Sequence, residues 1–224
     1  MTRTPTPILG LLAATTLSFM AEAIAMVTIP WFVLELTGSY AQMGIVGFFT
    51  FLPRVVATFL GGQVVDHLCF HTSSIASDVL SGLSVCGIAV LYATGNLTFT
   101  WLVVLVIVGA FFDGPGATAK DAMVPELAAA GGIDLDRVNA FFQGARRLSM
   151  LIGPIIAGFL IALVGTGNVL WVNAAVFALS ALVTFALVPA VAMPAAEHEP
   201  GSFWTNTLFG FRFLRQNRLM LWLG

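Results

Sequence analysis

Six long apolar runs constrain the fold of this 224-residue chain more than any other feature of its sequence. A helix needs about 20 apolar residues to cross a bilayer. Inside lipid each run must be helical, because its backbone amides can pair only within the segment. The runs cover residues 8–32, 40–65, 73–93, 100–119, 138–164 and 169–188. The sequence therefore predicts an all-α membrane protein with six transmembrane helices.

Composition narrows the possible functions. Only 9% of the residues are charged and 58% are hydrophobic, whereas a soluble domain is about 25% charged. Cys69 and Cys86 could form at most one bridge, which excludes a disulfide scaffold. The net charge of −2 provides no basic surface for nucleic acid. The lipid bilayer is therefore the first expected partner, and nucleic acid is not one.

Basic residues predict the orientation. Most connections are short and contain turn residues, so neighbouring helices should be antiparallel. The exception is 120–137, which contains Pro125 and is predicted to be a surface loop. With a cytoplasmic N-terminus, every basic residue except the intramembrane Arg54 falls on the inner side, as the positive-inside rule requires. These are Arg3, Lys120, Arg137, Arg146, Arg147, Arg212, Arg215 and Arg218. We expect a multi-pass protein of the inner (cytoplasmic) cell membrane.

The N-terminus has a competing interpretation. A basic residue, an apolar stretch and the small residues Ala21 and Ala23 imitate a secretory signal peptide with its cleavage site. The apolar pattern continues past that site to Phe32, and five further runs follow. Retention as the first transmembrane helix is therefore the simpler account.

The chain divides into three predicted segments. Residues 1–190 form the six-helix block, 191–218 a cytoplasmic interdomain segment, and 219–224 the start of a truncated seventh helix. Aromatic and aliphatic residues alternate with three arginines at helical spacing in the second segment, which predicts an amphipathic helix on the inner leaflet. We therefore expect this chain to be the first half of a longer transporter.

A series of short motifs points to a known family. In order along the chain they are Pro30-Trp31, Leu52-Pro53, Gly61-Gly62-x-x-x-Asp66, Phe111-Phe112-Asp113-Gly114-Pro115, Met123-Val124-Pro125-Glu126, Arg137-Val138-Asn139 and Gly153-Pro154. This order resembles drug efflux members of the major facilitator superfamily, in particular the drug:proton antiporters that include macrolide exporters and Tap-like pumps. The resemblance covers almost the whole chain.

The resemblance carries expectations about fold and activity. It implies twelve helices in two halves, each half built from two inverted three-helix repeats, and this chain would be the N-terminal half. It implies proton-coupled efflux of amphipathic small molecules by alternating access, with the missing C-terminal six-helix half as partner. The sequence contains no cluster of His or Cys ligands, no phosphate loop and no convincing nucleophile–base pair, so we expect no enzymatic activity and no cofactor.

One family motif is degenerate. Gly62 and Asp66 match the loop that locks the two halves together on the cytoplasmic side in this family. Of the three positions that are basic in the family, His67 and His71 occupy two and Phe70 the third. A lock here would need protonated histidines. The motif therefore has two interpretations, a pH-sensitive gate or a loop that has lost its gating role. Two histidines alone do not make a metal site.

A second motif lies in the fifth run. Gly153, Pro154 and Gly158, with Arg146 earlier in the same run, resemble the antiporter signature. Proline removes an intrahelical hydrogen bond and glycine permits close backbone approach, so the helix can bend and pack tightly. A purely structural kink would use the same residues. The accompanying motifs favour the antiporter interpretation.

Three ionisable residues stand out inside the predicted membrane core, where each costs about 3 kcal/mol unless it faces a cavity or a partner. Glu22 and Arg54 lie at nearly one depth, so they predict either a proton or cation site tuned by arginine or a permanent neutral pair. Asp113 is the expected inverted-repeat counterpart of Glu22. The glycines and proline after Asp113 predict a helix break that lines a water-filled path. The alternative is a helix-end carboxylate bonded to backbone, Arg146 or Arg147.

Other classes fit less well. Asp113, Gly114 and Ala117 imitate part of a phospholipid synthase motif, but Ala110 and Thr118 replace its first Asp and its Arg, so an enzyme of that type is rejected. A noncatalytic truncated or assembly-partner module remains the alternative to a transporter half. A six-helix channel or a homodimeric transporter ranks below both.

Overall fold

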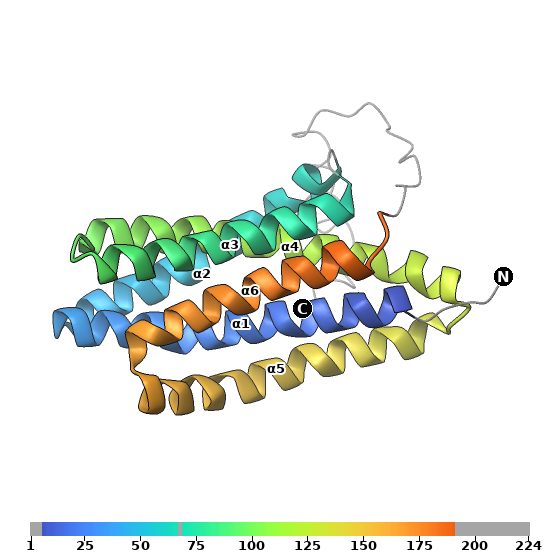
Figure 1. Cartoon of the computed structure of the whole chain (residues 1–224). Helices are drawn as coiled ribbons and strands as arrows, with labels where there is room; N and C mark the ends of the chain where they lie inside the picture. Colours follow the sequence, from blue (N-terminus) through green and yellow to red (C-terminus); the bar gives the residue numbers. More distant parts are fainter. Residues whose placement is uncertain (1–5, 67–68, 191–224) are drawn as a thin grey trace, which may run out of the picture. The chain divides into compact units, whose positions relative to one another are not determined.

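A computed structural model describes the backbone of residues 6–66 and 69–190, and the side chains of these residues except 54 and 58–66. The described part contains six helices, each long and apolar enough to cross a membrane, which confirms the predicted number. They are α1 (Thr6–Thr37), α2 (Tyr40–Asp66), α3 (Phe70–Ala93), α4 (Phe99–Gly131), α5 (Leu135–Val164) and α6 (Thr166–Leu187). Figure 1 shows them lying alongside one another as a bundle. The predicted interdomain segment 191–218 and the seventh-helix start 219–224 lie outside the described residues.

Short turns make successive helices antiparallel at most connections. Gly38, Gly95, Gly132 and Gly165 stand at the ends of helices with φ between 64° and 79°. A positive φ is strained for L-residues that carry a Cβ, but it is not strained for glycine. Gly132, for example, follows the last residue of α4, and its backbone N–H donates to the carbonyl oxygens of Ala128 and Ala129. The turns therefore fold the chain back on itself within a few residues.

The prediction of a surface loop at 120–137 is wrong. Helix α4 continues through Pro115 and Pro125 to Gly131, and Lys120 is 1% exposed. The predicted break after Asp113 is wrong for the same reason. Proline costs an interior helix about 3 kcal/mol, but neighbouring helices in a bundle hold such segments in place. At 1.5 Å per residue α4 is about 50 Å long, so it exceeds the roughly 30 Å hydrocarbon core.

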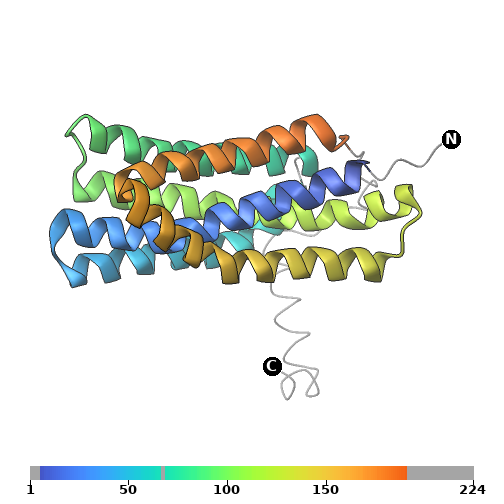
Figure 2. The ribbon, with the colours of Figure 1, turned by 60° about the horizontal axis from the view of Figure 1, so that its bottom comes forward.

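The packing has internal two-fold symmetry. Helix α1 packs mainly on α5 and α6, and α4 packs mainly on α2 and α3. If α1, α2 and α3 are exchanged with α4, α5 and α6 respectively, the contacts of α1 become those of α4. Helices α3 and α6 exchange with each other, and they are also in contact. Figure 2 shows α1 lying between α5 and α6, so the two sets of three helices interleave. This confirms the predicted architecture of two inverted three-helix repeats.

Small residues allow the close approaches in the bundle. A Cβ built on Gly109 would collide with Ser84, one on Gly116 with Ser77, and one on Gly153 with Ala23. The first two pairs join α3 to α4, and the third joins α1 to α5. Without a hydrophobic effect inside lipid, such small-residue contacts supply much of the packing between helices.

Two helices are covered least by the rest of the bundle. Along α2 and α5, large apolar side chains are exposed at helical spacing. They include Phe48, Phe51 and Val55 on α2, and Leu151, Ile155 and Phe159 on α5. These faces must therefore meet lipid or another protein.

Candidate functional site

A cavity of about 230 Å³ lies in the middle of the bundle. Every helix contributes to its wall, and most of the lining is apolar. Apolar lining residues include Met26, Ile29, Phe51, Val85, Ile88, Val106, Met150 and Phe177. A concave, mainly apolar space with a few polar groups is the usual form of a small-molecule site.

Two carboxylates line this cavity. Glu22 comes from α1, where it is 9% exposed, and Asp113 comes from the middle of α4. Ser81 of α3 donates a 2.6 Å hydrogen bond to Asp113 Oδ1. Because α1 and α4 are the first helices of the two repeats, Glu22 and Asp113 occupy corresponding helices. The structure thus brings together the two acidic residues that the sequence singled out as counterparts.

The alternative placement of Asp113 at a helix end is wrong. Asp113 lies well inside α4, which runs from Phe99 to Gly131. Arg146, one of its expected partners, instead contacts both carboxylate oxygens of Asp121, at 2.9 and 3.0 Å, and lies 4.3 Å from the centre of the Phe19 ring. Arg146 therefore joins α5 to α4 and α1.

The proposed gating residues are only partly visible. Gly62 and Asp66 belong to the last turns of α2, but the Asp66 side chain and the whole of His67 lie outside the described part. His71 lies in the first turn of α3, where its Nε2 is 3.3 Å from the Thr184 carbonyl oxygen of α6. The side chain of Arg54 is also outside the described part, so its pairing with Glu22 stays a prediction.

One residue of the antiporter signature packs against the wall of the cavity. Gly153 packs directly on Ala23, the neighbour of Glu22 in α1. Pro154 follows inside α5, and a Cβ added to Gly158 would meet no atom within 4 Å. Gly153 therefore sets the spacing of α1 and α5 beside the cavity, whereas Gly158 faces open space.

A third acidic residue, Asp78, was missed by the sequence reasoning. It is 3% exposed in α3, and both of its oxygens lie 2.8 Å from Lys120 Nζ of α4. Ser18 of α1 and Ser180 of α6 donate hydrogen bonds of 2.8 and 2.6 Å to the same carboxylate. An aspartate in the third apolar run was a sufficient signal, since intramembrane charges are functional candidates by default.

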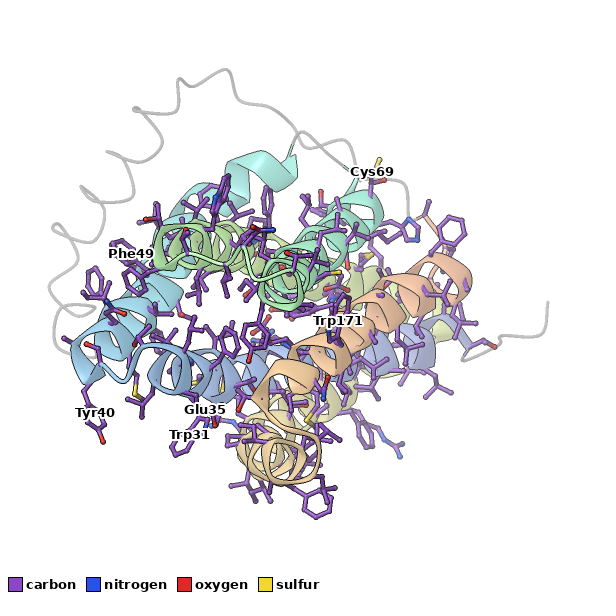
Figure 3. All side chains as sticks on the ribbon, turned by 60° about the vertical axis from the view of Figure 1, so that its left-hand side comes forward. Trp31, Glu35, Tyr40, Phe49, Cys69 and Trp171 are labelled. Carbon is purple, nitrogen blue, oxygen red and sulfur yellow. The ribbon has the colours of Figure 1, made fainter. Side chains whose placement is uncertain are left out.

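A different polar contact ties α1 to α6 at the far end of the bundle. Trp31 donates from its indole nitrogen to one oxygen of Glu35 at 2.7 Å, and Thr166 donates to the other at 2.6 Å. Figure 3 shows Trp31 and Glu35 side by side on α1. Glu35 is thus a carboxylate of α1 outside the cavity. Within the described part of the chain, no group of three or more His, Cys, Asp or Glu could hold a metal ion.

A bundle of helices able to span a membrane, with a mainly apolar cavity that contains two carboxylates, defines a multi-pass membrane protein with a candidate small-molecule site. Comparison with known families specifies the class further. The chain belongs to the major facilitator superfamily, whose sequence model matches residues 11–224. Members of this superfamily are transporters and not enzymes.

Curated relatives agree with this assignment. The chain is 33% identical over 222 residues to the multidrug efflux pump Tap of Mycobacterium tuberculosis (strain ATCC 25618 / H37Rv), covering 97% of this chain and 53% of that pump. It is 37% identical over 179 residues to the multidrug efflux pump Tap of Mycolicibacterium fortuitum, covering 79% of this chain and 44% of that pump. The chain therefore spans about half the length of the curated relatives it matches.

Proposed function

We propose that this chain is the N-terminal half of a proton-coupled transporter that exports amphipathic small molecules by alternating access. The observation that carries the proposal is the cavity, in which two carboxylates from corresponding helices interrupt an apolar wall. The efflux pumps that share a third of its sequence support the direction and the substrate class.

The apolar lining suits the substrate. Met26, Ile29, Phe51 and other apolar side chains offer a surface for the hydrophobic part of an amphipathic molecule. A positively charged group on the same molecule would interact favourably with Glu22 or Asp113. Aromatic and methionine side chains adapt to varied shapes, which suits a pump that exports several compounds.

The carboxylates supply the coupling. A charged side chain in the membrane core is costly, so gaining or losing one proton at Glu22 or Asp113 changes the stability of each conformation strongly. A substrate cation that requires the charged carboxylate would then compete with the proton. Exchange of one for the other couples export to proton entry.

A second six-helix half completes the transporter. Alternating access moves one half against the other around a central site, and the exposed apolar faces of α2 and α5 provide surface for such a partner. We place the protein in the inner (cytoplasmic) membrane with a cytoplasmic N-terminus. This orientation rests on the remaining basic residues, since Lys120 is buried in α4.

The degenerate motif belongs to the cytoplasmic gate in this proposal. Gly62 and Asp66 end α2 and Asp66 supplies the carboxylate, while His67 and His71 replace two of the family's basic residues. Closure would then strengthen as the histidines gain protons. Asp66→Asn and His71→Gln should weaken closure, seen as faster access of a thiol reagent from the inner side to a cysteine placed at Met26.

The function is tested by dye efflux from cells or vesicles that contain the chain joined to its second half. Glu22→Gln and Asp113→Asn should each slow efflux against a dye gradient, and the double variant should abolish it. Glu35→Gln removes a carboxylate of α1 outside the cavity and is the matched control. Proton-driven efflux that survives in the double variant contradicts the proposal. Expression of this chain alone should give no efflux, because one wall of the transport path is absent.

A further inference from the structure

The Asp78–Lys120 ion pair lies one to two helical turns from the carboxylates of the central cavity. Together with Ser18 and Ser180 it forms a polar layer across the bundle. Both side chains are almost fully buried, and the carboxylate has three donors from three other helices, namely Lys120, Ser18 and Ser180. Ser180 also lies 3.4 Å from Lys120 Nζ and 2.8 Å from the Ala14 carbonyl oxygen of α1. One carboxylate thus connects α1, α3, α4 and α6.

Each of these helices carries a cavity residue close to its residue in this layer. On α1, Glu22 follows Ser18 by four residues, and on α3, Ser81 follows Asp78 by three. At 3.6 residues per turn these separations are about one turn, so each pair lies on one helix face. On α4, Asp113 precedes Lys120 by seven residues, or about two turns. The layer and the cavity wall are therefore built on the same helix faces.

The contact between α3 and α4 links the two levels. Asp78 and Ser81 lie on α3, and each bonds to an α4 side chain: Asp78 to Lys120, and Ser81 to Asp113. Ser81 can reach Asp113 only when α3 and α4 keep their present axial register. A charge pair with two hydrogen bonds of 2.8 Å opposes a change of that register, because a sliding motion would separate buried charges.

We propose that Asp78 and Lys120 are positioning residues for Asp113. Their ion pair holds the register of α3 and α4, and Ser81 then holds the Asp113 carboxylate against the cavity wall. The transport role of Asp113 comes from the proposed function, but the positioning can be measured without transport. A pair that merely stabilises the bundle would leave the local environment of Asp113 unchanged when the helices remain folded.

The test measures how fast Asp113 reacts with dicyclohexylcarbodiimide, an apolar reagent that forms stable adducts with membrane-embedded carboxyl groups. The chain is purified in lipid nanodiscs, and the modified peptide is quantified by mass spectrometry. Asp78→Asn with Lys120→Gln removes both charges and keeps similar side-chain size. We expect this double variant, and Ser81→Ala separately, to change the labelling rate several-fold in the same direction.

Combining the changes tests whether the pair acts through Ser81. In the triple variant the rate should equal that of Ser81→Ala alone, since both changes remove the same contact. Lys120→Arg preserves the charge pair and should restore the wild-type rate. Ser74→Ala is the matched control on α3, because Ser74 is buried and its hydroxyl has no partner among the described residues.

The outcomes separate the possibilities. A wild-type rate in the folded Asp78/Lys120 variant overturns the proposal, and so does an additive effect in the triple variant. If the double variant does not fold, Ser180→Ala weakens the layer more mildly. The Asp113 labelling rate is then compared between Ser180→Ala, Ser81→Ala and the two changes combined. Unchanged proton-driven efflux by a complete transporter in which the Asp78/Lys120 change alters Asp113 labelling would instead contradict the proposed function alone.

Discussion

Two glycines of the antiporter signature should respond oppositely to the same substitution. Gly153 packs on Ala23, and an added Cβ would overlap the Cβ of that residue, whose backbone is already in van der Waals contact. Gly158 lies five residues later in α5 with open space at its Cβ position. The two substitutions share the helix, the original residue and the new residue. A difference between them therefore reports the packing contact of Gly153.

The magnitude follows from two effects. Alanine stabilises an interior helix position by about 1 kcal/mol relative to glycine, and this gain applies at both sites. Overpacking costs about 1–3 kcal/mol, and it applies only at Gly153, where the obstacle is the Ala23 Cβ, which cannot rotate away from the α1 backbone. Gly153→Ala should therefore lower the free energy of unfolding by up to about 2 kcal/mol, the larger overpacking cost less the helical gain. Gly158→Ala should leave it unchanged or raise it.

Reversible unfolding in mixed micelles of increasing denaturing detergent measures this difference. Circular dichroism follows the helix content, and the wild type is measured in parallel. Because Ala23 adjoins Glu22, Gly153→Ala should also slow efflux by the complete transporter, whereas Gly158→Ala should not. A Gly153→Ala chain as stable as the Gly158→Ala chain would refute the packing of α1 on α5 at this point.

Two further predictions concern charge and accessibility. Lys120→Gln leaves the buried Asp78 carboxylate without its cation and should lower the free energy of unfolding by about 3–5 kcal/mol. Adding Asp78→Asn should recover most of that loss in the same unfolding experiment. Absence of any recovery would contradict direct pairing of the two side chains. Cys69 is exposed at the start of α3 and Cys86 is half-buried within it, so a membrane-impermeant maleimide should label Cys69 much faster, and only from the cytoplasmic side; labelling of intact cells from outside would reverse the proposed orientation.

The helical framework was predictable because lipid leaves few alternatives. Backbone pairing inside the bilayer forces each apolar run into a helix, and five of the six helices begin and end close to the predicted residues. The fourth was cut short in the prediction. Pro125, Gly131 and the charges after Lys120 are typical of a loop, but contacts with neighbouring helices outweigh those local preferences.

The site was only half predictable for a related reason. Counting residues along each run gives depth, so Glu22 and Asp113 were recognised as counterparts. Depth does not give the face of a helix, and Asp78 and Lys120 meet only because α3 and α4 turn the right faces toward each other. Lys120 was also hidden by the misplaced loop. Ser18, Ser81 and Ser180 carried no signal at all, since serine is common in membrane helices.

The central claim is that the cavity carboxylates couple proton entry to export. The most direct test is efflux of a fluorescent cationic dye from vesicles that contain the complete transporter, driven by an imposed proton gradient. We predict that the gradient accelerates dye movement in the wild type and in Glu35→Gln, and has no effect when Glu22→Gln and Asp113→Asn are combined. Gradient-driven movement of normal speed in that double variant would contradict the claim.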